Sequence, residues 1–215
     1  MRSYDDAAAD YDGWFTRPVD RWEDARLARL LHPLVDGRRA LDLGCGTGWL
    51  LDHCAPSGYL GVDCSKPMLA ELLRKHPAAE VAHVEVMTDP AWAVPLRGDW
   101  DVITATWSLE FLGELGILLS VLRLLAGRGG VLALHGTLPR GHRRAHFTAR
   151  DWDHERLTPR LARQASRGAG MPRPRSSGTS ALPDALQFLG PAAFRAALAA
   201  PASAHYSALF TWRLP

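Results

Sequence analysis

The fold is decided by the stretch Ala40-Leu41-Asp42-Leu43-Gly44-Cys45-Gly46-Thr47-Gly48. In it an apolar run carries an acid, and three glycines then follow at alternate positions before a predicted helix start. Glycine has no Cβ, so its backbone can turn tightly and approach a ligand closely. The N-terminus of the next helix also offers unpaired N–H groups. The stretch therefore predicts a strand–loop–helix unit that binds a nucleotide-like ligand.

The spacing of the glycines distinguishes two classes of ligand. The pattern is G-x-G-x-G, and Trp49 stands where the dinucleotide fingerprint G-x-G-x-x-G would have its last glycine. Asp42, shortly before the first glycine, would repel a pyrophosphate but attract an amino group. These features favour a nucleoside with a cationic amino-acid tail, and they argue against the alternative of a NAD-dependent oxidoreductase.

A second acid follows at the end of another predicted strand, Tyr59-Leu60-Gly61-Val62-Asp63. In a nucleotide-binding βαβ unit, an acid about twenty residues after the loop accepts hydrogen bonds from ribose hydroxyls. Ser65 then predicts a helix cap, and Pro67 lies in the first turn of that helix. The two acids at the two ends of one crossover strengthen the prediction of a nucleoside site.

Together, residues 42–48 and Gly61-Val-Asp-Cys-Ser-Lys-Pro-Met-Leu69 resemble the class I S-adenosylmethionine-dependent methyltransferases. The resemblance is strong over residues 40–70, fair from about residue 4 to 135, and poor beyond residue 140. It implies an α/β fold with a doubly wound, mostly parallel sheet of seven or six strands, and helices on both faces in a three-layer αβα sandwich. The implied cofactor is S-adenosyl-L-methionine. The alternative without a ligand is a βα turn whose glycines only permit tight packing.

The resemblance also implies roles for particular residues. It places the methionine tail over the glycine loop, the ribose at Asp63, and the adenosine beside Cys64 and Met68. Asp89, after the third predicted strand, would meet the adenine amino group, with a surface turn as the alternative. The cofactor-binding residues implied are Asp42, Gly44, Cys45, Gly46, Gly48, Asp63, Cys64, Met68, Thr88, Asp89, Thr106 and Trp107.

The acceptor side must align a nucleophile, exclude water and, for a protonated nucleophile, supply a base. Trp107, after the fourth predicted strand, is a candidate wall of the transfer pocket, with packing under the next helix as the alternative. The catalytic candidates are His135, as a base at the end of the fifth strand, and Tyr11, whose ring would attract the sulfonium cation. A structural role is the alternative for both. More remote candidates are His142, His146 and His205.

Hydrophobic periodicity predicts alternating helices and strands. Helices are expected at residues 18–35, 47–54, 66–75, 113–126, 151–166 and 191–199. Strands are expected at residues 39–43, 59–62, 81–86, 99–106, 131–135 and 205–213. The family's sheet normally closes with a terminal hairpin of two strands. The sequence indicates one of them, and the other is short, displaced or missing.

The chain is expected to form a single methyltransferase domain over residues 1–215, a length that can bury one core. Residues 1–37 form an N-terminal lid and helix region in this interpretation. Residues 139–190 form an arginine-rich insert, and residues 167–180 within it should be mobile because they bury little apolar surface. Three roles stay open for the insert, namely a substrate lid, a surface loop and a basic patch for an acidic partner.

Composition limits the function classes. The formal net charge of +2 over 215 residues is too near balance to argue for a nucleic-acid partner. The three cysteines fit no zinc or disulfide spacing, which predicts no metal site and reduced thiols in a cytoplasmic protein. No apolar run is long enough to span a membrane, so no membrane contact is expected.

The methyl acceptor is inferred by elimination. The motifs of DNA-, glutamine- and arginine-methylating enzymes are absent from the sequence, and so is the acidic triad of metal-dependent catechol-type enzymes. The expected acceptor is a small molecule, of secondary metabolism, methylated on oxygen, nitrogen or carbon. The alternatives are a module that only binds S-adenosylmethionine, and an RNA or protein methyltransferase whose arginine-rich insert binds the partner.

Overall fold

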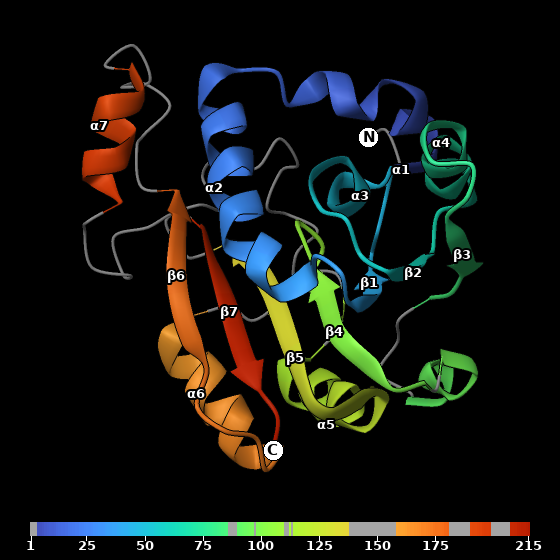
Figure 1. Ribbon diagram of the computed structural model, residues 1–215, viewed down its shortest axis with the longest axis vertical. Helices are drawn as coiled ribbons and strands as arrows, with labels where there is room; N and C mark the ends of the chain where they lie inside the picture. Colours follow the sequence, from blue (N-terminus) through green and yellow to red (C-terminus); the bar gives the residue numbers. More distant parts are fainter. Residues whose placement is uncertain are drawn as a thin grey trace.

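A seven-stranded sheet forms the middle layer of the molecule (Figure 1). The computed structural model describes residues 4–85, 90–96, 98–109, 112, 114–137, 158–180, 190–198 and 207–215. The strand order is β3-β2-β1-β4-β5-β7-β6, with parallel pairing from β3 through β5, and β7 is antiparallel to both of its neighbours. The strands are β1 (Arg39–Leu43), β2 (Gly58–Asp63), β3 (Glu80–His83), β4 (Trp100–Ala105), β5 (Ala126–Thr137), β6 (Arg175–Ser180) and β7 (Ser207–Arg213). The doubly wound α/β sheet that the resemblance implied is confirmed, with seven strands.

Helices cover both faces of this sheet, because alternate residues of each strand point to opposite sides. The α-helices are α1 (Tyr4–Ala7), α2 (Pro18–Val35), α3 (Trp49–His53), α4 (Lys66–Lys75), α5 (Leu115–Leu125), α6 (Pro159–Gly168) and α7 (Gly190–Ala197), and the 3-10 helices are η1 (Ala8–Trp14) and η2 (Pro90–Leu96). On β5, Val131 and Ala133 pack in one core with α2 and α3, whereas Leu132 and Leu134 pack in the other with α5 and α6. Two apolar cores on either side of one sheet make the predicted three-layer sandwich.

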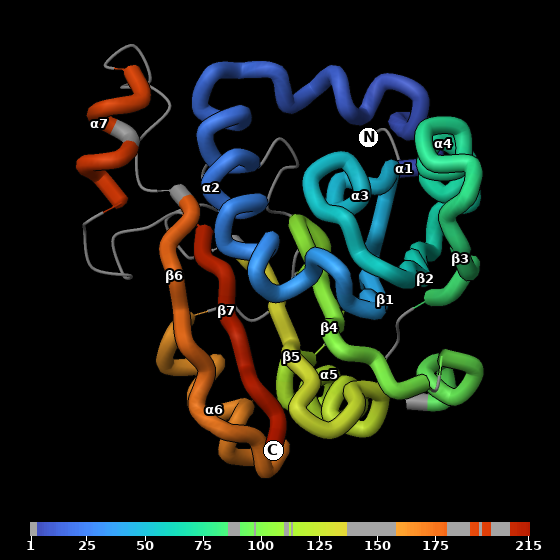
Figure 2. The backbone as a smooth tube through the Cα atoms, viewed as in Figure 1, coloured from blue at the N-terminus to red at the C-terminus, as the bar shows by residue number. Residues whose placement is uncertain are grey.

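The N-terminal segment runs along one edge of the molecule before the chain enters the sheet. Figure 2 shows it passing from beside α4 to the start of α2, over the region where the parallel strands end. Within it, η1 ends at Trp14, and α2 begins at Pro18 with Asp20 accepting a hydrogen bond from the Arg17 backbone N–H at 3.0 Å. This course places residues 4–14 next to the glycine-rich loop.

Local sequence signals set several of the helix boundaries. Helix α4 begins and ends where it was predicted, and the Ser65 hydroxyl caps it by accepting the Met68 N–H at 3.3 Å. Helix α3 begins two residues later than predicted, because Gly48 has a φ of 97° and so cannot belong to a right-handed helix. Helix α6 begins at Pro159, later than the predicted residue 151, and residues 151–157 lie outside the described residues.

The sequence predicts that residues 167–180 are mobile and part of an insert. This prediction is wrong for residues 175–180. Residues Arg175–Ser180 form β6, which pairs with β7 and supplies the hairpin strand that the sequence did not reveal. Thr179 and Met171 are both buried. The segment has few apolar residues because β6 is an edge strand, so it needs little apolar surface of its own to stay paired with β7.

None of the helices within the described residues has the length and hydropathy that crossing a membrane would require.

Candidate functional site

Three glycines shape the loop between β1 and α3. Gly44, Gly46 and Gly48 have φ angles of 64°, 52° and 97°, a region that other residues rarely adopt. The backbone N–H groups of Gly44 and Cys45 both donate to the carbonyl oxygen of Val62, at 2.8 and 3.1 Å. The loop is thereby held against the end of β2, where the second predicted acid lies.

The surroundings of the glycines differ. A Cβ on Gly44 would lie 2.5 Å from the Ser108 Cβ, and a Cβ on Gly48 would lie 3.0 Å from the Leu72 Cγ. A Cβ on Gly46 would meet nothing within 4 Å. Packing therefore explains the absence of a side chain at Gly44 and Gly48, whereas Gly46 faces open space that a ligand can occupy.

Asp63 joins the two loops of the predicted site. One carboxylate oxygen accepts the Gly46 backbone N–H at 2.8 Å, and the other accepts the Ser65 backbone N–H at 2.8 Å. A carboxylate can accept about four hydrogen bonds, so two acceptor positions are left for a ligand. This geometry fits the predicted contact with two ribose hydroxyls.

Asp42 lies beneath the loop instead of on its surface, and its side chain is buried. Its two oxygens accept hydrogen bonds from the Thr104 hydroxyl at 2.7 Å and the Tyr59 hydroxyl at 3.3 Å. Burial raises the pKa of Asp42 to about 7, although these hydrogen bonds oppose that rise. The described partners of Asp42 are therefore protein groups, and its predicted contact with a ligand amino group stays a prediction.

The other predicted cofactor residues differ in their exposure to solvent. Cys45, Met68 and Thr106 are buried, whereas Cys64 is exposed. Burial raises the pKa of the thiols of Cys45 and Cys64, so both remain protonated at neutral pH. Residues outside the described part of the chain are Thr88, Asp89, His142, His146 and His205.

The N-terminal segment is fixed to both loops by acids that the sequence did not single out. Asp12 accepts hydrogen bonds from the Thr47 hydroxyl at 2.5 Å and from the Lys75 ammonium at 2.9 Å. Asp5 accepts a hydrogen bond from the Ser65 hydroxyl at 2.5 Å. These contacts join residues 35 to 63 positions apart, so no local sequence signal could have revealed them.

Tyr11 lies at the centre of an aromatic cluster in this segment. Its ring centroid is 6.0 Å from that of Tyr4, 5.8 Å from that of Trp14 and 5.2 Å from that of Phe15. Burial, with the negative charges of Asp12 and Asp63, raises the pKa of Tyr11 to about 12. Tyr11 is thus a neutral ring near the Asp63 carboxylate, which fits a role in covering the ligand and not one as a base.

The acceptor candidates Trp107 and His135 contact each other. Trp107 has a φ of 59°, which is unusual for a residue with a bulky side chain, and its ring centroid lies 4.2 Å from that of His135. The neighbouring Ser108 contacts the glycine loop and donates a hydrogen bond to the Leu43 carbonyl at 2.7 Å. The residues after β4 therefore lie between the glycine loop and His135.

His135 is fully buried at the end of β5. Its Nε2 lies 3.0 Å from the Thr179 hydroxyl, which in turn lies 2.7 Å from the Ser207 hydroxyl, whereas Nδ1 has no partner among the described residues. Burial lowers the pKa of His135 to about 3, so its ring is neutral at physiological pH. His135 is thus the end of a buried polar chain that spans β5, β6 and β7.

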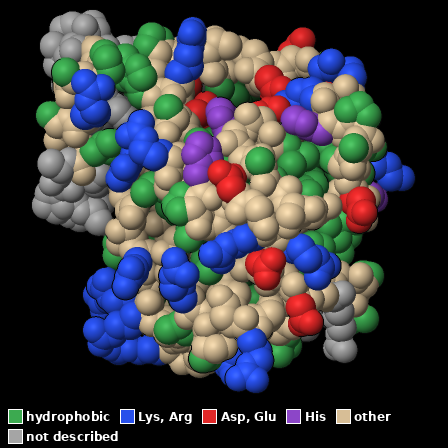
Figure 3. Space-filling view, in the orientation of Figure 1, with side chains coloured by type: hydrophobic (Ala, Val, Ile, Leu, Met, Phe, Trp, Pro, Cys, Tyr) green, Lys and Arg blue, Asp and Glu red, His purple; other side chains and the backbone are tan. Residues whose placement is uncertain are grey.

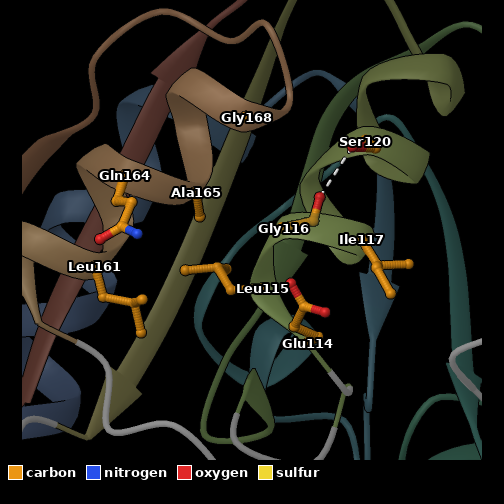
Figure 4. Close-up of a pocket in the computed structure, with 9 residues that line it drawn as sticks. All are labelled: Glu114, Leu115, Gly116, Ile117, Ser120, Leu161, Gln164, Ala165 and Gly168. Carbon is orange, nitrogen blue, oxygen red and sulfur yellow. Dashed lines mark hydrogen bonds between the residues drawn. The ribbon is translucent and has the colours of Figure 1, made fainter.

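A surface groove of about 490 Å³ lies elsewhere, between α5 and α6 (Figure 4). Leu115 and Ile117 line it from α5, and Leu161, Gln164 and Ala165 line it from α6. None of the glycine-loop residues takes part, and its polar groups include no cluster suited to a nucleoside. The candidate site is therefore the glycine loop and not this groove.

A comparison with protein families matches residues 41–132 to a methyltransferase domain. Among curated proteins, the chain is 31% identical over 105 residues to a ubiquinone biosynthesis O-methyltransferase of Methylococcus capsulatus, covering 47% of this chain and 44% of that protein. It is 35% identical over 114 residues to a trans-aconitate 2-methyltransferase of Delftia acidovorans, covering 50% of this chain and 40% of that protein. The chain thus matches less than half the length of these relatives.

Solved structures share the whole fold. A putative methyltransferase in complex with the Trm112 methyltransferase activator of Haloferax volcanii has a TM-score of 0.69 at 19% identity, covering 100% of this chain and 99% of that one. An S-adenosylmethionine-dependent methyltransferase of Mesorhizobium loti has a TM-score of 0.62 at 20% identity, covering 91% of this chain and 99% of that one. At this level of identity, the similarities establish the fold.

The contact between Gly44 and Ser108 can be tested by adding one methyl group. We expect Gly129→Ala to lower the free energy of unfolding by about 1–2 kcal/mol, because Gly129 has a φ of 72° but open surroundings. Gly44→Ala carries a similar backbone cost, and the clash with Ser108 should add about 1–3 kcal/mol. Urea unfolding of both variants measures the difference, and equal losses would contradict the close contact.

The burial of His135 predicts a pH-dependent stability. Its pKa is about 3 in the folded protein and about 6.5 in an unfolded chain, so the unfolded chain binds the proton first as pH falls. As the pH falls from 7 to 5, this histidine should therefore lower the free energy of unfolding by about 2 kcal/mol. His135→Gln lacks this titration. As the pH falls over the same interval, its free energy of unfolding should therefore rise by that amount relative to the free energy of unfolding of the wild type.

Asp42 and Asp24 contribute an opposite pH dependence to the stability of the protein. Comparing the wild type with His135→Gln cancels this contribution, because both proteins contain the two acids. Burial raises the pKa of each in the folded state, so that acid favours folding through them in both proteins. Urea unfolding at pH 5, 6 and 7 would measure the free energy of unfolding of both proteins across this interval. A difference between the two proteins that does not change with pH would show that His135 is not buried as a neutral ring.

Proposed function

We propose that the protein is a class I S-adenosylmethionine-dependent methyltransferase that methylates a small-molecule acceptor, which the methyltransferase-domain match over residues 41–132 and the shared fold support. The cofactor of this family is S-adenosyl-L-methionine, which supports the nucleoside prediction over the dinucleotide alternative. The observation that carries the proposal is the open space at Gly46 beside the Asp63 carboxylate.

The residues around this space suit the proposed cofactor. When bound, S-adenosyl-L-methionine supplies a methyl group that its positive sulfur already activates. Asp63 has two acceptor positions left for the ribose hydroxyls, and Gly46 lets the ligand approach the backbone closely. The aromatic cluster around Tyr11 covers the loops, where it excludes water and attracts a cation. The proposed role of this half of the site is to bind the cofactor and to shield it from water.

A small acceptor is supported by the relatives and by the surroundings of Trp107. The names of the two curated relatives describe an O-methyltransferase of ubiquinone biosynthesis and a methyltransferase of trans-aconitate. In this chain, Trp107 separates the glycine loop from the buried polar chain of His135, Thr179 and Ser207. We place the acceptor on the loop side of Trp107, where the ring would align it toward the cofactor.

His135 stays the proposed base for a protonated acceptor. Its Nδ1 has no partner among the described residues, but the Trp107 ring lies against it, so the ring must move before an acceptor can reach this nitrogen. A histidine with a pKa of about 3 is a weak base, because burial opposes its positive charge. It can therefore take a proton only from a comparably acidic group, such as a carboxylic acid, and not from a phenol, whose pKa is about 10.

A second candidate is methylation of an RNA or a protein. In the Haloferax volcanii complex, the methyltransferase is held by an activator protein, and that methyltransferase matches the present chain over its whole length. In the present chain, arginines crowd the sequence between residues 140 and 175. This candidate predicts that activity requires a macromolecule, whereas the leading proposal predicts turnover on a small acceptor alone.

Gly46→Ala is the sharpest test of the cofactor site. Gly129→Ala is its matched control, because both glycines have positive φ and neither Cβ would meet an atom within 4 Å. The two variants should lose similar stability, but only Gly46→Ala should weaken the binding of S-adenosylmethionine, by about tenfold or more. Isothermal titration calorimetry measures the affinity. An unchanged affinity in Gly46→Ala would place the cofactor elsewhere.

Asp63→Ala should abolish measurable binding of the same cofactor. Hydrogen bonds to a charged group contribute about 1.5–3 kcal/mol each, so losing two of them weakens binding by at least about a hundredfold. Asp101→Ala is the control, because Asp101 also accepts a backbone N–H, from Arg39 at 2.9 Å, but lies outside the loops. Equal affinities for Asp63→Ala and Asp101→Ala would refute the role assigned to Asp63.

A further inference from the structure

The charges of the chain are segregated along its length. Residues 1–114 carry nineteen acidic residues and eleven lysines and arginines, whereas residues 115–215 carry four acidic residues and fourteen arginines. The total of +2 conceals this division. A net charge describes the protein at long range, but a partner in contact responds to the local charge.

The structure gathers part of the basic half at one end of the sheet. Along α6, the exposed residues Arg160, Arg163 and Arg167 recur at a spacing that places them on one side of the helix. They extend over about 10 Å. The opposite side of α6 packs inward through Ala162 and Ser166, whose hydroxyl accepts the Trp212 indole N–H at 2.8 Å. The arginine stripe therefore faces away from the sheet.

Further arginines continue this surface around the free edge of β6. Because Trp212 faces α6, the next residue, Arg213, points to the opposite face of the sheet. Arg175 shares that face, since it pairs with Thr211. Figure 3 shows Lys and Arg side chains gathered at the lower left, over α6 and the beginning of β6. We define the arginine edge as the exposed residues Arg160, Arg163, Arg167, Arg173, Arg175 and Arg213.

Among the residues that the structure describes, no acid neutralises the arginine edge. Residues 158–180 and 207–215 contain no acidic residue. Within the described part of the chain, none of the six arginines forms an ion pair. By contrast, Arg17 and Arg74 in the acidic half are paired with Asp20 and Glu71. Six like charges left unpaired repel one another, so a polyanion that binds them relieves the repulsion.

We propose that the arginine edge binds the phosphate backbone of a nucleic acid. Protein–protein interfaces have an apolar core with few charged residues, whereas interfaces with nucleic acids are polar and positively charged. Among the described residues, the exposed large hydrophobic side chains are Phe15, Leu73, Val94, Ile117 and Leu124, and none belongs to α6, β6 or β7. Arginine also pairs with phosphate in a bidentate way. The surface thus fits phosphates better than an acidic protein.

The arginine edge is separate from the proposed cofactor site. Four strand spacings lie between β1 and β6 in the sheet, which is a distance of about 19 Å. A nucleic acid held at β6 can therefore be bound together with S-adenosylmethionine. The inference holds whether or not the protein methylates the nucleic acid, so its test uses binding alone.

The test compares two triple variants of the full chain. Arg160→Gln/Arg163→Gln/Arg167→Gln removes the stripe on α6, and glutamine keeps the helix propensity of arginine. The control, Arg21→Gln/Arg29→Gln/Arg74→Gln, removes the same charge from exposed arginines of the acidic half. Fluorescence anisotropy would follow binding to labelled duplex RNA, single-stranded RNA and duplex DNA of equal length, between about 50 and 200 mM salt. Circular dichroism would confirm that both variants fold.

The proposal predicts that the wild type and the control bind at least one of these probes with an affinity that falls steeply with salt. The stripe variant should bind about tenfold or more weakly, and the slope of log affinity against log salt should become shallower by about two to three. Absence of binding to all three probes at the lowest salt would overturn the proposal, and so would equal losses in both variants. Binding to polyglutamate or to anionic lipid vesicles, but to no nucleic acid, would overturn it as well.

Discussion

The candidate site depends on one carboxylate that holds two loops together. Asp63 ends β2, and its oxygens accept the backbone N–H groups of Gly46 in the first loop and Ser65 in the second. A hydrogen bond from a backbone N–H to a charged acceptor is stronger than one between neutral groups. Both loops therefore keep a fixed position relative to the strand ends, and the N-terminal segment closes over them through Asp5 and Asp12.

Two buried polar groups near the candidate site are governed by a different physical effect, which is burial. Asp42 and His135 both lie in the interior, and burial moves each toward its neutral form, by raising the pKa of the acid and lowering that of the histidine. Hydroxyl groups supply hydrogen bonds to both residues. Asp42 bonds to Thr104 and Tyr59, and His135 bonds to Thr179. Burial thus reduces the charge of the lining beneath the candidate site, and the hydroxyl groups supply its hydrogen bonds.

The distribution of charge matters more in this protein than its sum. The family match covers residues 41–132, which include the cofactor loops, whereas the arginine edge lies beyond that match. The proposed cofactor site and the proposed nucleic-acid surface therefore lie in different parts of the chain. A net charge of +2 is too near balance to argue for a nucleic-acid partner, whereas the segregation of charge within the fold supports the proposal of one.

The sequence by itself determined the cofactor half of the fold. The glycines of residues 44–48, the acid at Asp63 and the cap at Ser65 act within a few residues, so they indicate the βαβ unit and the bounds of α4 before any tertiary contact is known. Only the tertiary structure decided what covers and closes this unit. Strand β6 carries little hydrophobic signal because it is an edge, Asp12 reaches a threonine 35 residues away, and Asp42 faces the core although its sequence position suggested a ligand. These contacts join segments distant in sequence, and only their arrangement in space gives each residue its partner.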